Sequence, residues 1–156
     1  MPQHNAILLL GSNIMPEENI PRALGLIADH LPILAQSRIW ETEAVGSRGP
    51  NFLNVAIKVA TDLEAQDIKN AIARPIENQL GRIRSTDKFM PRTMDIDVIV
   101  LDDQVLDENL WKKAFTAIPV SELAPELICP SNGKPLREIA AELKSSAFAE
   151  PFEPHN

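Results

Sequence analysis

Two aspartates separated by one residue, in the segment Asp95-Ile96-Asp97, are the residues of this sequence best suited to chemistry. They stand at the head of an apolar segment, Met94 to Leu101, that is typical of a strand. Because side chains alternate along a strand, both carboxylates should lie on one face while Ile96 and Val98 face the core. Two such carboxylates repel each other unless a cation lies between them, and they suit Mg²⁺ bound jointly with substrate phosphates. A solvated strand end is the structural alternative, because an isolated Asp-x-Asp is frequent by chance.

Positive charge gathers directly before this pair, in a chain whose formal net charge is -7. The stretch from Gly81 to Arg92 has no apolar periodicity and opposes one carboxylate, Asp87, with the cations Arg82, Arg84, Lys88 and Arg92. Guanidinium groups bind phosphate oxygens through paired donors, and a basic loop can close over a nucleotide and exclude water. Cations beside paired carboxylates are the set used in metal-assisted phosphoryl transfer. A charged, solvated loop is the alternative.

A second candidate site lies in the segment Phe52 to Val59, which is rich in strand formers. Asn54 is a polar amide in this apolar segment, and Phe52 falls on the same face of the strand. An aromatic face can stack on a planar ligand, and an amide offers a donor and an acceptor to the edge of a heterocycle. The sequence equally allows Asn54 to cap a loop and Phe52 to be ordinary core.

Hydrophobic periodicity predicts the elements that must position these residues. Strands are predicted at Ala6–Leu10, Ser37–Thr42, Phe52–Val59 and Met94–Leu101. Helices are predicted at about 17–31 and from a capping box at Thr61-Asp62-Leu63-Glu64 through Ile68, Ile72, Ile76 and Leu80. Pro75 lies inside the second helix and should kink it.

The order β, α, β, β, α, β predicts an α+β fold, the ferredoxin-like split βαβ arrangement. Its antiparallel sheet would carry two helices on one face, and the chain would continue into a C-terminal helical extension. Between the first strand and the first helix stands Gly11-Ser12-Asn13, which could present amides to a ligand, although a tight turn explains it as well.

Composition favours one domain over residues 1–156, because a chain of this length and 44% hydrophobic content can bury about two thirds of its surface. The single Cys129 cannot form an internal disulfide, and the first residues lack the pattern of a signal peptide, so a cytoplasmic protein is expected. No apolar run approaches the roughly 20 residues that cross a membrane. Twenty-two acidic against 15 basic residues argue against a nucleic acid or an anionic membrane as partner.

Taken in order, several blocks of the chain resemble the 6-hydroxymethyl-7,8-dihydropterin pyrophosphokinase family of folate biosynthesis, over about residues 6–126. The most specific block is Pro-Arg-x-x-Asp-x-Asp after a basic loop. The blocks are Gly11-Ser12-Asn13, Phe52-Leu53-Asn54, Glu77 with Leu80-Gly81-Arg82-Ile83-Arg84, Pro91-Arg92-Thr93-Met94-Asp95-Ile96-Asp97-Val98, and, more weakly, Phe115 with Ala124-Pro125-Glu126.

The resemblance implies transfer of the β,γ-diphosphoryl group of ATP to the hydroxymethyl group of the pterin, with release of AMP. It implies that Asp95 and Asp97 hold two Mg²⁺ ions that bridge the triphosphate, and that Arg82 and Arg92 steady the transferred group. Such a displacement at phosphorus needs alignment and charge neutralisation more than a strong base. No obligatory protein partner is implied.

The same resemblance assigns the remaining residues to the two substrates. Arg84, Lys88 and Arg92 would contact the nucleotide from the closing loop, with Glu77 and Val98 near the adenosine. Phe52 and Phe115 would sandwich the pterin ring. Asn54 and the backbone from Thr42 through Glu43 to Val45 would bind the edge of that ring.

The chain departs from the family's pattern near the nucleotide. Leu106-Asp107-Glu108 stands where a His-Pro-type segment is usual, and Lys113 replaces an Arg two residues before Phe115. Met90 replaces a small residue before Pro91, and Pro75 interrupts a helix expected to contact ATP. These changes predict looser nucleotide binding, because Asp107 would repel phosphate.

Two other functions remain open from the sequence. One is a non-catalytic regulatory domain of the same fold that binds a pterin or a nucleotide without turnover. The other, an RNA-binding sheet, needs exposed aromatics on its central strands and a basic face. The chain offers only Phe52 and an acidic composition, so the enzyme is the leading hypothesis.

Overall fold

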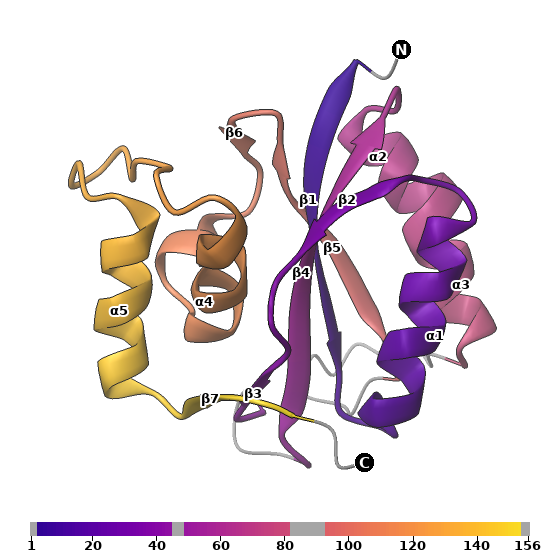
Figure 1. Ribbon diagram of the computed structural model, residues 1–156, viewed down its shortest axis with the longest axis horizontal. Helices are drawn as coiled ribbons and strands as arrows, with labels where there is room; N and C mark the ends of the chain where they lie inside the picture. The colour runs from indigo at the N-terminus through magenta and orange to yellow at the C-terminus, as the bar shows by residue number, and fades with distance from the viewer. Residues whose placement is uncertain (1–2, 45–48, 82–92, 154–156) are drawn as a thin grey trace.

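An antiparallel sheet forms the centre of the protein in a computed structural model that describes residues 3–44, 49–81 and 93–153 (Figure 1). Its long central strands are β1 (His4–Ser12), β4 (Phe52–Thr61) and β5 (Asp95–Leu101). The strand order is β6-β5-β1-β4-β3-β7, with β2 also paired to β4. The shorter strands are β2 (Ile33–Gln36), β3 (Trp40–Thr42), β6 (Gln104–Val105) and β7 (Ala149–Pro151). The order β5-β1-β4-β3 is that of a split βαβ sheet, so the predicted α+β, ferredoxin-like fold is confirmed.

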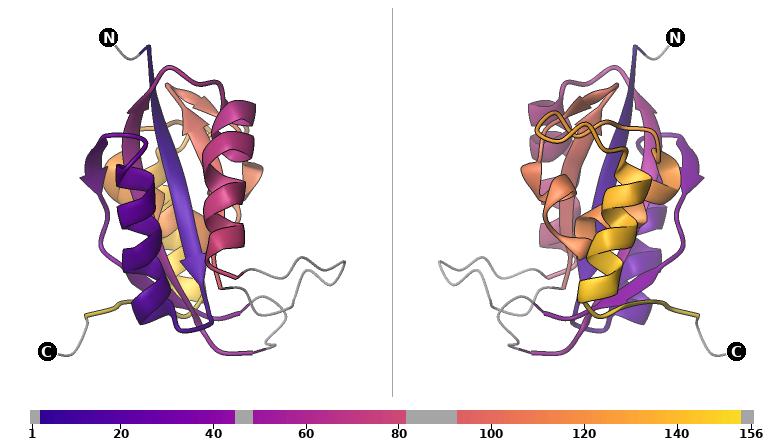
Figure 2. Two further views of the ribbon diagram at one scale, coloured as in Figure 1. Left: turned by 90° about the vertical axis from the view of Figure 1, so that its right-hand side faces the viewer. Right: turned by 90° about the vertical axis from the view of Figure 1, so that its left-hand side faces the viewer.

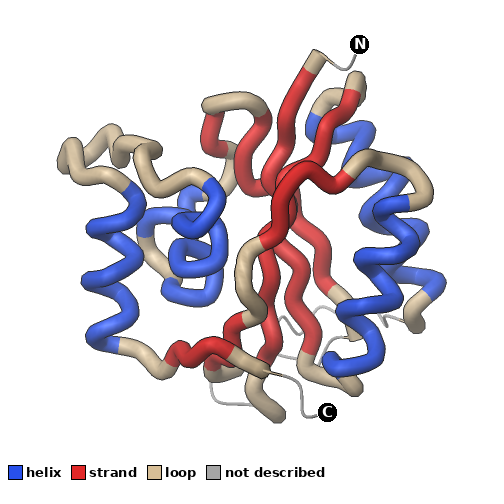
Figure 3. Tube along the Cα trace, in the orientation of Figure 1, coloured by secondary structure: helices blue, strands red, loops and turns tan. Residues whose placement is uncertain are grey.

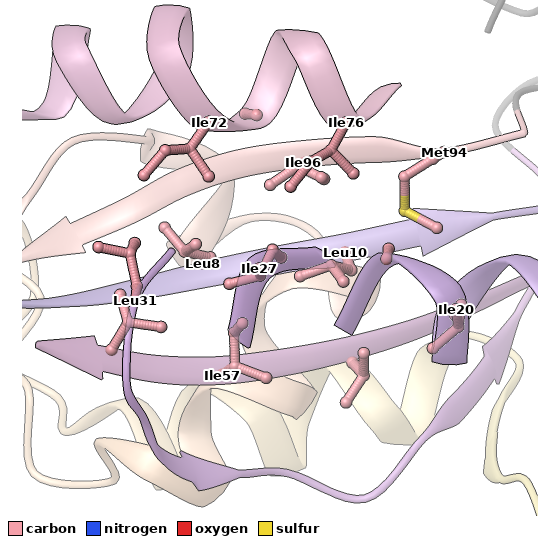
Figure 4. Close-up of a cluster of buried hydrophobic side chains, with 14 of the residues drawn as sticks. Leu8, Leu10, Ile20, Ile27, Leu31, Ile57, Ile72, Ile76, Met94 and Ile96 are labelled. Atoms are coloured by element: carbon pink, nitrogen blue, oxygen red, sulfur yellow. The ribbon is translucent and has the colours of Figure 1, made fainter. Parts of the chain in front are cut away.

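One face of the sheet is covered by the two predicted helical segments. They are α1 (Pro16–Ala28) and a continuous run of α2 (Ala65–Ile68), the π-helical turn η2 (Lys69–Ala73) and α3 (Arg74–Gln79). Leu8, Leu10, Ile57 and Ile96 of the sheet pack there against Ile27, Ile72 and Ile76 of the helices (Figure 4). Burial of these aliphatic side chains is the main force that holds the layer to the sheet.

The C-terminal extension covers the opposite face, which the sequence did not predict. It comprises the 3₁₀ turn η3 (Glu108–Trp111), α4 (Ala114–Leu123) and α5 (Leu136–Ser146). Ile7, Leu9 and Ile99 of the sheet are buried against Leu110 and Ile118. The sheet therefore lies between two helical layers, which Figure 2 shows from either side and Figure 3 shows as strands in red between helices in blue. The physical reason is that β1 is apolar on both faces, so neither face can be left to water.

The predicted strand Ser37–Thr42 is wrong in its first half. Strand structure covers Ile33–Gln36 and Trp40–Thr42, and Ser37 lies in the break. The Ser37 backbone N–H donates to the Ala56 carbonyl, but the Ala56 N–H donates to Ser37 Oγ rather than to a carbonyl, both at 2.9 Å. A side-chain hydroxyl thus takes the place of a backbone acceptor and interrupts the ladder.

The start of the second helical segment also differs from its prediction. Thr61 is the last residue of β4, and its Oγ1 accepts a hydrogen bond from the Leu63 N–H at 3.0 Å. The helix begins at Ala65 after Glu64, with no side-chain cap, so the predicted capping box is wrong. At Pro75 the helix continues, because the preceding turn widens into η2, where the Arg74 N–H donates to the Lys69 carbonyl. In place of the predicted kink at Pro75, the structure has a π-helical turn.

The chain after β5 turns at Asp102, which has a positive φ of 54°, and forms β6. The last strand, β7, was not predicted and pairs with β3 at the edge of the sheet. In the described ranges, none of the helices combines the length and apolar character that crossing a membrane requires.

Candidate active site

Seven of the predicted site residues meet in one pocket on the face of the sheet that α4 covers: Thr42, Glu43, Phe52, Asn54, Asp95, Asp97 and Phe115. Register brings them together: Gly11 of β1 is paired with Asn54 of β4 on one side and with Asp95 of β5 on the other. Paired residues of neighbouring strands project from the same face. The pocket holds about 440 Å³ of empty space, counting the part open to solvent, and is lined by Leu9, Gly11, Thr42, Glu43, Phe52, Asn54, Asp95, Asp97 and Phe115.

Two aromatic side chains from different layers line this pocket. Phe52 is the first residue of β4, and Phe115 lies in the first turn of α4. Both are half-buried, which leaves part of each ring accessible from the pocket. A planar ligand that enters here meets an aromatic residue from the sheet and another from the helix.

The polar end of the same pocket is formed by Asn54 and Thr42. Asn54 is 3% exposed, and its Nδ2 donates to Thr42 Oγ1 over 2.7 Å. Thr42 comes from β3, the strand paired with β4 at this position. The hydrogen bond fixes the amide, so Asn54 offers a ligand a preset donor and acceptor pattern.

Asp95 and Asp97 lie at the beginning of β5 and line the pocket together. Although Asp97 as a residue is exposed, the surrounding protein removes water from its carboxyl group, and this is the main reason that its pKa is raised to about 7. The charge of Asp95, and less strongly those of Asp107 and Glu77, raise the pKa further. A cation between the two carboxylates would relieve this repulsion.

The donor set fits Mg²⁺ better than a metal enclosed by protein. In the three described ranges, no group of three or more His, Cys, Asp or Glu residues could hold a metal ion. Two carboxylates on one strand leave most of an octahedral shell to water and substrate oxygens. Such a site would take its ion together with a phosphate-bearing ligand.

Glu77 supports the aspartate strand from α3. It is 3% exposed, and its Oε2 accepts a hydrogen bond from the backbone N–H of Ile96 at 2.8 Å. Pairing of β5 with β6 involves only Val100 and Leu101, so the Ile96 N–H lies beyond that ladder. Glu77 therefore satisfies a backbone donor between the two aspartates, a contact that the sequence did not predict.

A second hollow adjoins the aspartates on the outer side of β5. It is lined by Ala65, Gln66, Lys69, Ile96, Asp97, Val98, Leu106 and Asp107. Val98 and Asp107, both predicted near the nucleotide, thus lie in one hollow with Asp97. Asp107 also has a structural task, because its Oδ1 accepts from the Asn109 N–H at 2.9 Å at the start of η3.

Several predicted residues fall outside the described ranges: Val45, Arg82, Arg84, Lys88 and Arg92, together with Met90. Sequence reasoning missed Leu9 and Lys69, and it placed Gly11 after the first strand, either in a tight turn or presenting amides to a ligand. Gly11 and Leu9 are two residues apart on β1, so strand alternation could have placed both on the face of the aspartates. Lys69 carried no signal, because its place in a hollow depends on how the helix packs.

Comparison with known proteins gives a consistent result. The profile of the family "7,8-dihydro-6-hydroxymethylpterin-pyrophosphokinase (HPPK)" matches residues 7–125. A protein from Aquifex aeolicus (strain VF5), named 2-amino-4-hydroxy-6-hydroxymethyldihydropteridine pyrophosphokinase, is 32% identical over 143 residues, which cover 85% of this chain and 88% of that protein. A Pseudomonas aeruginosa protein of the same name is 32% identical over 145 residues, which cover 85% and 87% of the two chains.

Solved structures extend the likeness to the fold. A structure described as HPPK-DHPS in complex with substrates superposes with a TM-score of 0.71 at 12% identity and covers 94% of this chain. Plasmodium falciparum HPPK-DHPS with pteroate superposes with a TM-score of 0.69 at 12% identity and covers 93% of this chain. The present chain spans 44% and 43% of those two chains.

Proposed function

Because the chain belongs to the 7,8-dihydro-6-hydroxymethylpterin-pyrophosphokinase family, we propose that it transfers diphosphate from ATP to the hydroxymethyl group of 6-hydroxymethyl-7,8-dihydropterin in folate biosynthesis. The observation that carries this proposal is one pocket that joins an aromatic and amide wall to a pair of aspartates. A ring-binding wall beside a phosphate-and-metal site is what a transfer between these two substrates requires. Residues 1–156 would act as one domain, in the cytoplasm and without an obligatory protein partner.

The pterin would bind in the part of the pocket formed by Phe52, Asn54 and Phe115, the ring-binding wall. Phe52 and Phe115 would sandwich the ring, while Asn54 and the Thr42 to Val45 segment, including Glu43, would bind its polar edge. The Asn54 to Thr42 hydrogen bond of 2.7 Å supports this role, because it orients the amide before the ligand arrives. In this placement the hydroxymethyl group would lie toward Asp95, past the Gly11 position.

Asp95 and Asp97 would hold two Mg²⁺ ions together with phosphate oxygens of ATP. Bound Mg²⁺ would neutralise charge on the triphosphate as the displacement proceeds. The charge repulsion from Asp95, which contributes to the raised pKa of Asp97, supports this role, because a bound cation would relieve it. With one metal ligand missing, turnover should fall by several orders of magnitude, so Asp95→Ala and Asp97→Ala should be inactive.

In the reaction, the hydroxymethyl oxygen attacks the β-phosphorus of ATP and loses its proton. The bond between the α,β-bridging oxygen and the β-phosphorus breaks, and AMP leaves with that oxygen. Arg82 and Arg92 would steady the transferred group, and Arg84 and Lys88 would close over the nucleotide. Glu77 and Val98 would lie near the adenosine, and the hollow that Val98 lines supports this role for Val98.

The decisive experiment measures AMP formed from ATP by the purified chain. AMP should appear only when 6-hydroxymethyl-7,8-dihydropterin and Mg²⁺ are both present, in equal amount to the pterin diphosphate. Asp97→Ala serves as the inactive reference. If calorimetry instead detected pterin binding while no AMP formed, the chain would be a non-catalytic binding protein of the same fold.

A further inference from the structure

Gly11 lies between Asn54 and Asp95 on the sheet, and it contributes no side chain to the pocket between them. It lies within β1, with Asn54 as its partner on β4 and Asp95 as its partner on β5. The three residues share one face of the sheet, and all three line the pocket. The residue between the amide and the carboxylate therefore has no side chain.

A side chain at this position would collide with the ring-binding wall. An ideal Cβ on Gly11 would lie 2.9 Å from Asn54 Oδ1 and 3.6 Å from Phe52 Cδ1. A separation of 2.9 Å is below ordinary van der Waals contact for a carbon and an oxygen. Asn54 cannot easily move away, since it is buried and its Nδ2 is held by Thr42 Oγ1 at 2.7 Å.

Backbone conformation does not explain this glycine. The glycines of the described ranges with positive φ are Gly49, Gly81 and Gly133, and Gly11 is not among them. At Gly25, Gly81 and Gly133, an added Cβ meets nothing within 4 Å. Gly11 thus differs from Gly25, Gly81 and Gly133, because its position must leave space for a neighbouring side chain.

We propose that Gly11 is a positioning residue for the heterocycle site, an inference that rests on the proposed function. Its missing side chain allows the Asn54 carboxamide to keep the orientation set by Thr42. It also leaves free the space between Asn54 and Asp95, where the hydroxymethyl substituent of the pterin ring would lie.

The test compares Gly11→Ala with Gly25→Ala, the same substitution at an open position in α1. Pterin affinity is measured by calorimetry, and the KM for each substrate is measured from AMP formation. Gly11→Ala should weaken pterin binding by about tenfold or more, while the KM for ATP changes by less than about twofold. Gly25→Ala should leave both values unchanged. Unchanged pterin affinity in Gly11→Ala would overturn the inference.

A double-mutant cycle tests whether the effect runs through Asn54. Asn54→Ala removes the atom that the new methyl group would meet, so adding Gly11→Ala to it should weaken pterin binding by less than about twofold. If Gly11→Ala weakened pterin binding equally in the wild type and in Asn54→Ala, the effect would not run through Asn54, and the proposal would be wrong. Should Gly11→Ala alone fail to fold, recovery of folding in the double variant would support the clash with Asn54, and failure to recover would refute it.

The cycle also separates this inference from the proposed function. Thermal unfolding of the ligand-free variants measures the coupling between Gly11→Ala and Asn54→Ala without any substrate. If the wild-type chain bound no pterin and formed no AMP, the proposed function would fail. A coupling between the two substitutions in unfolding temperature would then still show that the added methyl group clashes with Asn54. If no coupling were found, the inferred clash would be wrong as well.

Discussion

Glu77 Oε2 accepts a hydrogen bond of 2.8 Å from the backbone N–H of Ile96, the residue that separates the two aspartates of the pocket. One buried carboxylate on α3 thereby holds the strand that carries Asp95 and Asp97. The orientation of the two aspartates depends on a residue from a different layer of the fold.

Glu77→Ala should therefore both destabilise the fold and weaken the metal site. The Ile96 N–H would lose its acceptor inside the protein, at a cost of about 1–3 kcal/mol in the free energy of unfolding. The Mg²⁺ concentration for half-maximal activity should rise, because the aspartates lose their support. Urea unfolding and magnesium titrations of AMP formation measure the two effects. Glu77→Gln keeps an acceptor oxygen and should recover much of the stability; equal losses in both variants would contradict this role for the hydrogen bond.

The raised pKa of Asp97 predicts how stability changes with pH. The folded protein binds the Asp97 proton up to about pH 7, whereas an unfolded aspartate releases it near its ordinary value of 3.8. Between these values the folded state holds more protons, so this group makes stability fall as pH rises toward 7. Magnesium with a nucleotide should offset the loss near pH 7.

Asp97→Asn provides the test, because the amide does not titrate. The thermal unfolding temperatures of the wild type and of Asp97→Asn should diverge as pH rises from about 4 to 7 without Mg²⁺, with the variant becoming relatively more stable. Asp103→Asn is a matched control, since Asp103 is exposed and outside the pocket. Parallel curves for wild type and Asp97→Asn would refute the assignment.

At the opposite end of β1, His4 should contribute stability with the reverse sign. Its Nδ1 lies 2.7 Å from Asp102 Oδ2 and its Nε2 lies 3.2 Å from Glu64 Oε1. The hydrogen bond with Asp102 is the main reason that the pKa of His4 is raised above 6.5. The imidazolium then stabilises the fold below pH 6.5, and this contribution is lost as pH rises through the folded pKa.

Asp102 sets the lower limit of this window. The Asn5 N–H and then His4 lower the pKa of Asp102, so its contribution is present above its ordinary value and disappears as pH falls through the folded pKa. The thermal unfolding temperature of His4→Gln should lie below that of the wild type near pH 5.5, and the two temperatures should converge in alkaline solution. His30→Gln, an exposed histidine, is the control. A pH-independent difference would point to packing rather than charge.

Asp107→Asn should tighten ATP binding, because the change removes a negative charge from the hollow shared by Asp97 and Val98. The asparagine can still accept from the Asn109 N–H, so η3 keeps its cap. Asp107→His should tighten ATP binding too but lose about 1 kcal/mol of stability with the cap. Calorimetry with a non-hydrolysable ATP analogue measures the affinity. Weaker or unchanged binding by both variants would remove Asp107 from the nucleotide site.

The sequence predicted best the residues whose positions follow from strand alternation. Asp95 and Asp97 share a face because they are two residues apart on a strand, and Asn54 lies on that same face through register. Phe115 was predicted only from the resemblance, because α4 is apolar nearly all round and its direction depends on packing. Local patterns failed at Ser37 and Thr61, where hydroxyl groups bind neighbouring backbone instead of following the predicted ladder or cap.

The pairing of β7 with β3 covers an edge of the sheet. β3 carries Thr42 of the pocket, and without Ala149–Pro151 its outer backbone groups would form an open strand edge. Open edges recruit strands from other molecules and promote aggregation. Pro151, which has no N–H, stands opposite Trp40 and makes the new edge a poor template for further pairing. β7 should therefore protect the strand that carries Thr42 from pairing with strands of other molecules.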